Sequence, residues 1–270
     1  MSRLEPGKRR AKRALGQNFL VDPNLQRKIV EELGASPGDA VLEVGPGHGE
    51  LSRHLAGRVA RLVLVEKDRD LAAELGDRWA GRDDVTVVEG DALDMDLADL
   101  APAGRALRIV SNVPYNVTSP LLFAFLSLRP PATRIVVMVQ REVAERIVSA
   151  PGRKTYGALS VGVQAIADAD LVFTVGREAF RPRPDVESAV LRIVPDPERV
   201  RAIDEAALRH VTRVFFNRRR KQMQKTLRTA PELAFEGDAI AFLRALGLDP
   251  RARPETIAPE AFVELSRALA

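Results

Sequence analysis

An apolar run followed by three closely spaced glycines constrains this chain more than any other feature. The run Ala-Val-Leu-Glu-Val at 40–44 predicts a buried strand, and Gly45, Gly47 and Gly49 separate it from an expected helix. Glycines here allow positive φ angles and let a ligand approach the backbone, while the helix start offers N–H groups. A dinucleotide fingerprint would need glycine where this chain has Glu50, and no P-loop is present. The motif therefore predicts a cradle for a nucleoside-like ligand that lacks a pyrophosphate.

Two carboxylates follow the next two apolar runs. Glu66 comes directly after the run at 61–65, and Asp91 lies just beyond the run at 85–88. At a strand end Glu66 can accept hydrogen bonds from both ribose hydroxyls, and Asp91 can accept one from an adenine amine. Either residue alone could equally be a helix cap or a solvated acid. Together with the glycines, however, they predict one nucleoside site at three strand ends.

A fourth strand is expected at 107–110, and it runs into Asn112, Pro114 and Tyr115. Pro114 cannot donate a hydrogen bond to a neighbouring strand and holds Val113 extended, so the chain leaves the sheet here. An Asn amide, a carbonyl beside a proline and an aromatic face form a compact site for a planar group with an NH2, such as a nucleobase. The alternative is a proline turn that packs a tyrosine.

Composition excludes several classes of function. The chain of 270 residues has no cysteine and only three histidines, so we expect no disulfide, iron–sulfur cluster or metal centre. No stretch approaches 18 consecutive apolar residues, and the N-terminus lacks the apolar core of a secretory signal, so we expect a cytoplasmic protein without a membrane contact. A net charge of +4 favours a polyanionic partner.

The expected elements alternate between strands and helices as far as a proline-rich linker at 195–197 and are only helical after it. A helix is expected from Pro23, capped by Asp22 and ended by Gly34, and the last strands are expected around 159–172 and 188–194. We therefore predict an α/β domain at 1–195 and a small helical domain at 196–270.

Basic residues gather in two places. Arg218, Arg219, Arg220 and Lys221 lie in a stretch without an acidic residue, and their spacing with neighbouring basic residues suggests one helix face directed at phosphates. A shorter basic arm includes Arg9 and Arg10. Either could instead be an ordinary solvated surface.

Taken together, the motifs resemble those of the ribosomal RNA adenine N6,N6-dimethyltransferases. The resemblance includes the motifs at 42–52, 65–68, 89–93 and 112–116, and it continues at 15–19, 140–146, 156–161 and 180–190. It implies a Rossmann-like class I methyltransferase domain and S-adenosyl-L-methionine as cofactor. Departures from the family pattern are small. Val113 stands where leucine is usual, and Ser52 stands where threonine is usual. The stretch at 174–176 lacks the Val-Pro step of the family, so the resemblance does not predict the path of that loop.

The resemblance also implies roles for the cofactor-binding residues. Asn18, Leu20 and Asn112 would border the cofactor, with Gly45 and Gly47 on its methionine side. Glu66 would bind the ribose, and Asp91 with Ala92 would bind the adenine.

The implied catalytic residues surround the target base. Asn112 and the Pro114 carbonyl would hold the target amine, and Tyr115 and Phe180 would stack on the base. The expected reaction is dimethylation of two adjacent adenosines in the 3′-terminal hairpin loop of small-subunit ribosomal RNA, with the immature small subunit as partner and a monomeric enzyme. Three alternatives stay open: a large-subunit adenine methyltransferase of the macrolide-resistance type, a non-catalytic assembly or transcription factor, and a small-molecule methyltransferase.

Overall fold

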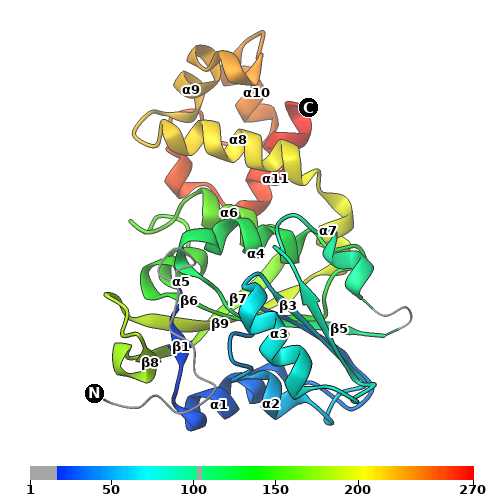
Figure 1. Cartoon of the computed structure of the whole chain (residues 1–270). Coiled ribbons are helices and arrows are strands. Elements are labelled where there is room, and N and C mark those ends of the chain that lie inside the picture. Colours follow the sequence, from blue (N-terminus) through cyan, green and yellow to red (C-terminus); the bar gives the residue numbers. More distant parts are fainter. Residues whose placement is uncertain (1–16, 102–104) are drawn as a thin grey trace. The chain divides into compact units, whose positions relative to one another are not determined.

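Strands and helices alternate through most of the chain (Figure 1). The computed structural model describes residues 17–101 and 105–270. The strands are β1 (Phe19–Leu20), β2 (Ala40–Val44), β3 (Arg61–Glu66), β4 (Val85–Glu89), β5 (Leu107–Asn112), β6 (Arg134–Gln140), β7 (Ala167–Val175), β8 (Phe180–Arg181) and β9 (Ser188–Pro195). Seven of them form one sheet in the order β4-β3-β2-β5-β6-β9-β7, and β1 pairs separately with β8.

The central sheet is mainly parallel. β2 pairs in parallel with β3 on one side and with β5 on the other, so that Val44 lies beside both Val65 and Ser111. β4 and β6 extend these pairings in parallel, and β9 runs antiparallel to β6. The chain order therefore reverses between β2 and β5, which is where ligands bind in open α/β sheets. The sheet confirms the predicted Rossmann-like α/β fold class.

Eleven α-helices and several short 3-10 turns connect and follow the strands within the described residues. The helices are α1 (Pro23–Leu33), α2 (Ser52–Leu55), α3 (Arg69–Arg78), α4 (Thr118–Leu126), α5 (Arg141–Ile147), α6 (Ala158–Gln164), α7 (Pro197–Ala202), α8 (Glu205–Asn217), α9 (Met223–Thr229), α10 (Ala239–Ala245) and α11 (Pro259–Ala268). The 3-10 turn that matters for the site is η3 (Tyr115–Val117). None of the described helices has the length and apolar character needed to cross a membrane.

Local sequence explains α1 well but not α6. Asp22 accepts hydrogen bonds from the first free N–H groups of α1, and Gly34 ends the helix in the left-handed conformation, as predicted. The expected strand at 159–172 is wrong in its first half, because residues 158–164 form α6 and β7 begins only at Ala167. A short run of small and apolar residues fits either a strand or a fully buried helix.

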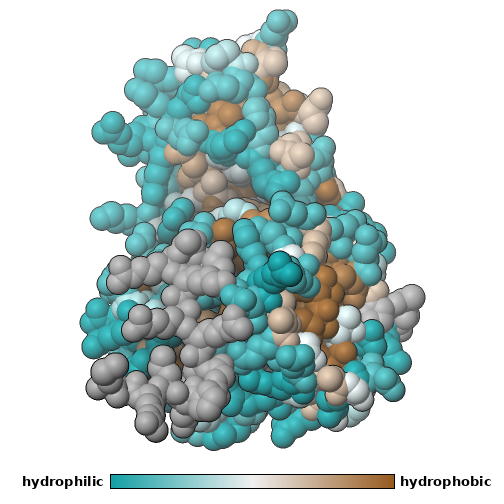
Figure 2. All heavy atoms as spheres, in the orientation of Figure 1, coloured by the Kyte–Doolittle hydropathy of each residue, from teal (hydrophilic) through white to brown (hydrophobic). Residues whose placement is uncertain are grey.

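Helices on the sheet bury its apolar side chains. α1 packs on β5 and β6, α3 packs on β3 and β4, and α2 lies beside α1. All five residues of β2 are buried, including the carboxyl group of Glu43. Most of the surface that Figure 2 shows is hydrophilic, and most of the buried side chains are apolar.

The chain divides into two compact units, each assembled from two separate stretches of sequence. The first unit contains the described residues up to Ala144 and Asp170–Val194, and the second contains Glu145–Ala169 and Pro195–Ala270. The second unit thus includes a stretch that the sequence assigned to the α/β domain. Tyr156 ties that stretch to the C-terminal part, because its hydroxyl donates to the Ile257 carbonyl at 2.8 Å.

Candidate active site

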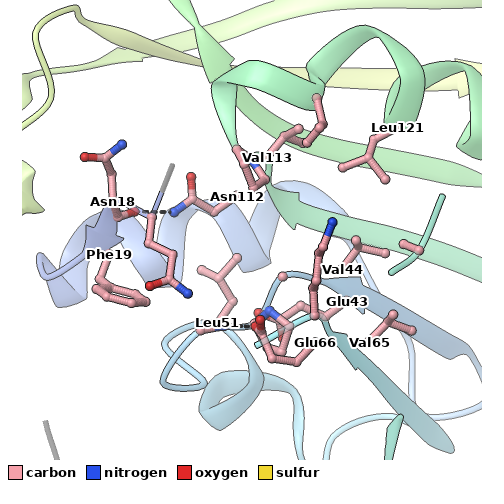
Figure 3. Close-up of a pocket in the computed structure, with 18 of the residues that line it drawn as sticks. Asn18, Phe19, Glu43, Val44, Leu51, Val65, Glu66, Asn112, Val113 and Leu121 are labelled. Carbon is pink, nitrogen blue, oxygen red and sulfur yellow. Dashed lines mark hydrogen bonds between the residues drawn. The ribbon is translucent and has the colours of Figure 1, made fainter. Parts of the chain in front are cut away.

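A pocket lies in the first unit at the C-terminal ends of β2, β3 and β5. Figure 3 shows Asn18, Phe19 and Asn112 around one part of it, and Glu43, Val65 and Glu66 around another. Ten of the predicted cofactor and catalytic residues line this pocket: Asn18, Leu20, Gly45, Gly47, Glu66, Asp91, Ala92, Asn112, Pro114 and Tyr115. The folded chain therefore gathers motifs from separate stretches of sequence into one place.

The glycine loop has the backbone that its sequence predicts. Gly45, Gly47 and Gly49 have φ angles of +69°, +61° and +73°, which L residues with a side chain rarely adopt. A Cβ on Gly47 would lie 2.9 Å from the ring of Phe19. This position therefore needs glycine for two reasons, its backbone conformation and the close approach of Phe19.

Glu66 connects the glycine loop to the end of β3. Its side chain is only 5% exposed, and its two oxygens accept hydrogen bonds from the N–H groups of Gly47 (3.1 Å) and Asp68 (2.8 Å). Burial raises the pKa of Glu66, and these backbone hydrogen bonds oppose that rise. The carboxyl group is held rigidly at the pocket wall, with lone pairs left over for a ligand hydroxyl.

Asp91 forms the end of the pocket beyond β4. One of its oxygens lies 2.5 Å from Lys67 Nζ, and the other accepts from the N–H of Leu93 at 3.0 Å. The hydrogen bond from Lys67 lowers the pKa of Asp91, so the carboxylate is ionised at neutral pH. Lys67 also lines the pocket. The sequence contained this residue in a recognised motif but gave no reason to assign it a role.

Asn112 and Asn18 meet across the pocket from the acidic residues. Asn112 Nδ2 donates to the main-chain carbonyl of Asn18 at 2.9 Å, as the dashed line in Figure 3 marks. Because oxygen and nitrogen lie on opposite sides of a planar amide, this contact leaves Asn112 Oδ1 on the other edge. Asn112 therefore offers an acceptor at the carboxyl end of β5.

Pro114 and Tyr115 follow directly. The Pro114 carbonyl accepts from the N–H of Val117 at 3.1 Å and from Thr118 Oγ1 at 3.4 Å. Thr118 Oγ1 also lies 3.3 Å from the Tyr115 carbonyl, so a ligand donor can bind the second lone pair of Pro114 when this hydroxyl turns fully to Tyr115. The Tyr115 hydroxyl lies 2.7 Å from Ser188 Oγ, and burial raises the pKa of Tyr115. This contact holds the hydroxyl end of the Tyr115 ring in place. The face of the ring stays available to stack on a planar group.

The structure does not bring Phe180 to the pocket, which corrects the expectation from sequence. Its side chain is 0% exposed and packs in the core of the first unit, because β8 pairs with β1 and places Phe180 opposite Leu20. In this structure its ring therefore presents no face to the pocket. The aromatic residues that do line the pocket are Phe19 and Tyr115.

Two acidic residues in the pocket wall were missed from sequence. Glu43 is 2% exposed and accepts a hydrogen bond from Ser52 Oγ at 2.6 Å, and burial raises its pKa to about 8. Burial also raises the pKa of Glu50. The sequence signal for Glu43 was an acidic residue inside an apolar strand, where burial of a charge is costly.

The basic residues predicted for RNA binding lie in the second unit. Residues 218–221, here called the basic turn, join α8 to α9 and do not lie on a helix face, contrary to the expectation. Arg218 forms an ion pair with Glu232 (3.0 Å) and Arg219 with Glu255 (2.7 Å). Arg220 and Lys221 are exposed, and neither has an acidic partner in the part of the chain that the structure describes.

Two further expectations concern the basic N-terminal arm and a metal centre. Arg9 and Arg10 lie outside the described residues. Within 17–101 and 105–270, no three His, Asp or Glu side chains are grouped so that they could hold a metal ion.

Sheet and pocket together define a class of protein. The sheet places a glycine loop, a rigid carboxyl group and an Asn-Val-Pro-Tyr segment at adjacent strand ends, around a pocket without a pyrophosphate-binding loop. This combination is that of a Rossmann-like methyltransferase.

Comparison with known proteins identifies the family. The model of the family described as "Ribosomal RNA adenine dimethylase" matches residues 8–266. A protein named "Ribosomal RNA small subunit methyltransferase A" from Nitratidesulfovibrio vulgaris (strain DP4) is 45% identical over 97% of both chains. One of the same name from Moorella thermoacetica is 41% identical over 96% of this chain and 92% of its own.

Solved structures share the fold of this chain. A dimethyladenosine transferase from Plasmodium falciparum matches 92% of this chain and 95% of its own with a TM-score of 0.80 and 24% identity, which supports the fold alone. The 23S rRNA methyltransferase ErmE matches 93% of this chain and 99% of its own with a TM-score of 0.68 and 28% identity. The chain belongs to the ribosomal RNA adenine dimethylase family.

Proposed function

We propose that this protein transfers methyl groups from S-adenosyl-L-methionine to N6 of two adjacent adenosines in the 3′-terminal hairpin loop of small-subunit ribosomal RNA. The observation that carries this proposal is the 45% identity, over 97% of both chains, to a small-subunit methyltransferase. The protein acts on the immature small subunit as a cytoplasmic monomer.

The pocket fits a cationic nucleoside cofactor. When bound, S-adenosyl-L-methionine supplies an electrophilic methyl group on a positively charged sulfur. Gly45 and Gly47 leave room for its methionine part, and Glu66 accepts from its ribose hydroxyls. Asp91 and Ala92 border the adenine at the end of β4, while Asn18 and Leu20 cover the opposite side. The ionised carboxylate of Asp91, whose pKa is lowered, complements the positive charge of the ligand.

The target amine is held by acceptors. The lone pair of an adenine N6 is delocalised into the ring, so an enzyme must localise it toward the methyl group. Asn112 Oδ1 and the Pro114 carbonyl do this by accepting the two N6 hydrogens, which favours a pyramidal amine. No strong base is required before transfer because the proton can leave afterwards. This agrees with a pocket whose lining contains no histidine among the described residues.

An unstacked base also needs an aromatic platform. Reaching N6 in structured RNA requires the adenine to leave its stack, and a planar side chain compensates for the lost stacking. Tyr115 serves this role, since Ser188 fixes its hydroxyl and its ring borders the pocket. Phe180 supports the site from the core by pairing β8 with β1.

The basic turn contributes to choosing the RNA. One flipped adenine cannot identify the substrate, so selection needs contacts to phosphates over a larger surface. Arg220 and Lys221 are the members of the turn most available for such contacts, and Arg218 and Arg219 must share their charge with Glu232 and Glu255. We assign phosphate binding to all four, with the larger share to Arg220 and Lys221.

A large-subunit methyltransferase and a non-catalytic factor on the same fold are the rivals. The ErmE structure is 28% identical to this chain, well below the 45% of the small-subunit relative. A factor without catalysis would not need Asn112, Pro114 and Tyr115 around the pocket.

Mass spectrometry of both ribosomal RNAs tests the proposal. Cells that lack the gene should contain unmethylated adenosines at the 3′-terminal hairpin of the small-subunit RNA, and the purified protein with S-adenosyl-L-methionine should methylate them. A loss confined to large-subunit RNA would assign the rival activity. An unchanged pattern in both RNAs would indicate a non-catalytic factor.

A further inference from the structure

The segment Gln17–Leu20, here called the strap, contacts several motifs of the pocket without belonging to the seven-stranded sheet. Gln17 Nε2 donates to Asp68 Oδ2 at 3.3 Å, beyond the end of β3. The Asn18 carbonyl accepts from Asn112, at the end of β5. The strap therefore joins the expected ribose side of the pocket to the expected methyl-transfer side.

The two remaining residues of the strap fix its position over the glycine loop. Phe19 packs against Gly47 and places its ring 4.6 Å from the ring of His48. Leu20 is 2% exposed and pairs with Phe180 between β1 and β8. Only two residues of the strap form this strand, so backbone pairing alone provides a weak attachment.

Gln26 supplies a further attachment from α1. Its side chain is 2% exposed, and its Nε2 donates to the Leu20 carbonyl at 2.7 Å. Its Oε1 lies 3.3 Å from His54 Nε2 on α2, which holds the amide in the orientation that donates to the strap. Gln26 does not line the pocket. The donor end of this buried amide therefore acts on the site through the strap, and its acceptor end contacts α2.

Orientation of the Asn112 amide decides whether the target amine meets an acceptor or a donor. Rotation of the amide by 180° would exchange Oδ1 and Nδ2 and present N–H groups to the N6 hydrogens. The Asn18 carbonyl can bind only the nitrogen end, because a carbonyl accepts and does not donate. Figure 3 shows this nitrogen turned toward Asn18.

We propose that the strap is an orienting device for Asn112 and that Gln26 is the positioning residue that holds the strap in place. This inference rests on the proposed function, since it assigns the Asn112 oxygen to the target amine. It adds a residue of α1 that touches neither the pocket nor the RNA in that proposal.

Gln26→Met tests the inference, because methionine keeps the length of the side chain but cannot donate to the Leu20 carbonyl. The single-turnover rate with saturating cofactor and RNA should fall on the order of ten- to a hundredfold, the scale of a small misplacement of a reacting group. The dissociation constants of cofactor and RNA should change less than about threefold. The NMR signals of the Asn112 side-chain NH2, assigned by their loss in Asn112→Ala, should move toward solvent-exposed values.

Gln164→Met is the matched control. Gln164 Nε2 donates to the carbonyls of Ile147 (2.7 Å) and Ser149 (2.9 Å) in the second unit, so the same change removes similar hydrogen bonds away from the strap. Its thermal stability should fall, while the methyl-transfer rate and the Asn112 signals stay as in the wild type. If Gln26 had only a structural role, both variants would lose thermal stability and keep the wild-type methyl-transfer rate and Asn112 signals.

Gln26→Glu provides a second variant should the methionine change prevent folding. An ionised glutamate side chain at this position cannot donate to the Leu20 carbonyl, whereas a protonated one can. The rate of this variant relative to the wild type should therefore rise as the pH falls. A normal rate in both Gln26 variants, or unchanged Asn112 signals in them, would overturn the inference. If the wild type methylated no RNA, the proposed function would fail, while the NMR measurement would still test the strap.

Discussion

The pocket of the first unit and the basic turn of the second unit both stand out in the sequence, but their side chains have different surroundings. In the pocket, Glu66 and Asn112 are held by backbone groups at strand ends, so their positions follow from the fold. In the basic turn, Arg218 and Arg219 are engaged by acids from elsewhere in the chain. A motif at a strand end thus predicts geometry, whereas a run of charges predicts only composition. The comparison also implies that changes in the pocket have larger effects than changes in the turn.

The largest effect is expected for Asn112→Ala. If its Oδ1 accepts from the target amine mainly in the transition state, the rate of methyl transfer should fall roughly a hundred- to a thousandfold. RNA affinity should change little. Single-turnover assays with saturating cofactor measure this, and Asn116→Ala, four residues further on and exposed at the pocket rim, is the comparison. Equal losses in both variants would remove the special role of Asn112.

Glu66→Ala should have the next largest effect. A hydrogen bond to a charged group contributes about 1.5–3 kcal/mol, so the affinity for S-adenosyl-L-methionine should fall by that amount. Because Glu66 also accepts from Gly47, part of the loss reflects a looser glycine loop. Calorimetric titration measures the change, and RNA affinity should stay normal. Undiminished cofactor binding would contradict the ribose assignment.

A third prediction concerns pH and the buried Glu43. Its pKa in the folded protein is about 8 against an ordinary value of 4.5. Between these values the folded state holds one more proton than the unfolded state, so stability falls as pH rises, by about 1.4 kcal/mol per unit. Glu43→Gln cannot ionise and should gain about 2 kcal/mol on the wild type between pH 6 and pH 7.5. Urea unfolding at the two pH values measures the difference, and a pH-independent difference would show that Glu43 is already ionised at pH 6.

The smallest effects are expected in the basic turn. Changing Arg220 and Lys221 together to alanine should lower the slope of log affinity against log salt by about 1.4–1.8, or 0.7–0.9 for each phosphate contact. Changing Arg218 and Arg219 should lower it less, because Glu232 and Glu255 already neutralise part of their charge and leave less of it for phosphates. RNA binding over a salt series measures both. Equal slopes for the two variants would erase the distinction between paired and unpaired charges.

Sequence predicted the fold class and most of the pocket because both depend on local patterns. Strand ends follow from apolar runs, and the conformation of Gly45 and Gly47 follows from residue type. Phe180 was misplaced because its burial depends on the pairing of two-residue strands that are far apart in the chain. The partners of Arg218 and Arg219 were missed for the same reason, since contacts between distant residues leave no periodic signal.

The interleaving of the two units constrains how the molecule can be cut or synthesised. The seven-stranded sheet includes β9, which is synthesised after residues 145–169. Residues 145–169 belong to the second unit, and their partners there, such as Ile257, are synthesised last. A fragment ending at residue 195 would keep α6 and Tyr156 but lose α8 and Ile257, which cover them. Its exposed apolar surface would favour aggregation over a soluble minimal methyltransferase. The chain therefore completes both units late in synthesis, and an isolated catalytic fragment has to omit or redesign residues 145–169 rather than end at the linker.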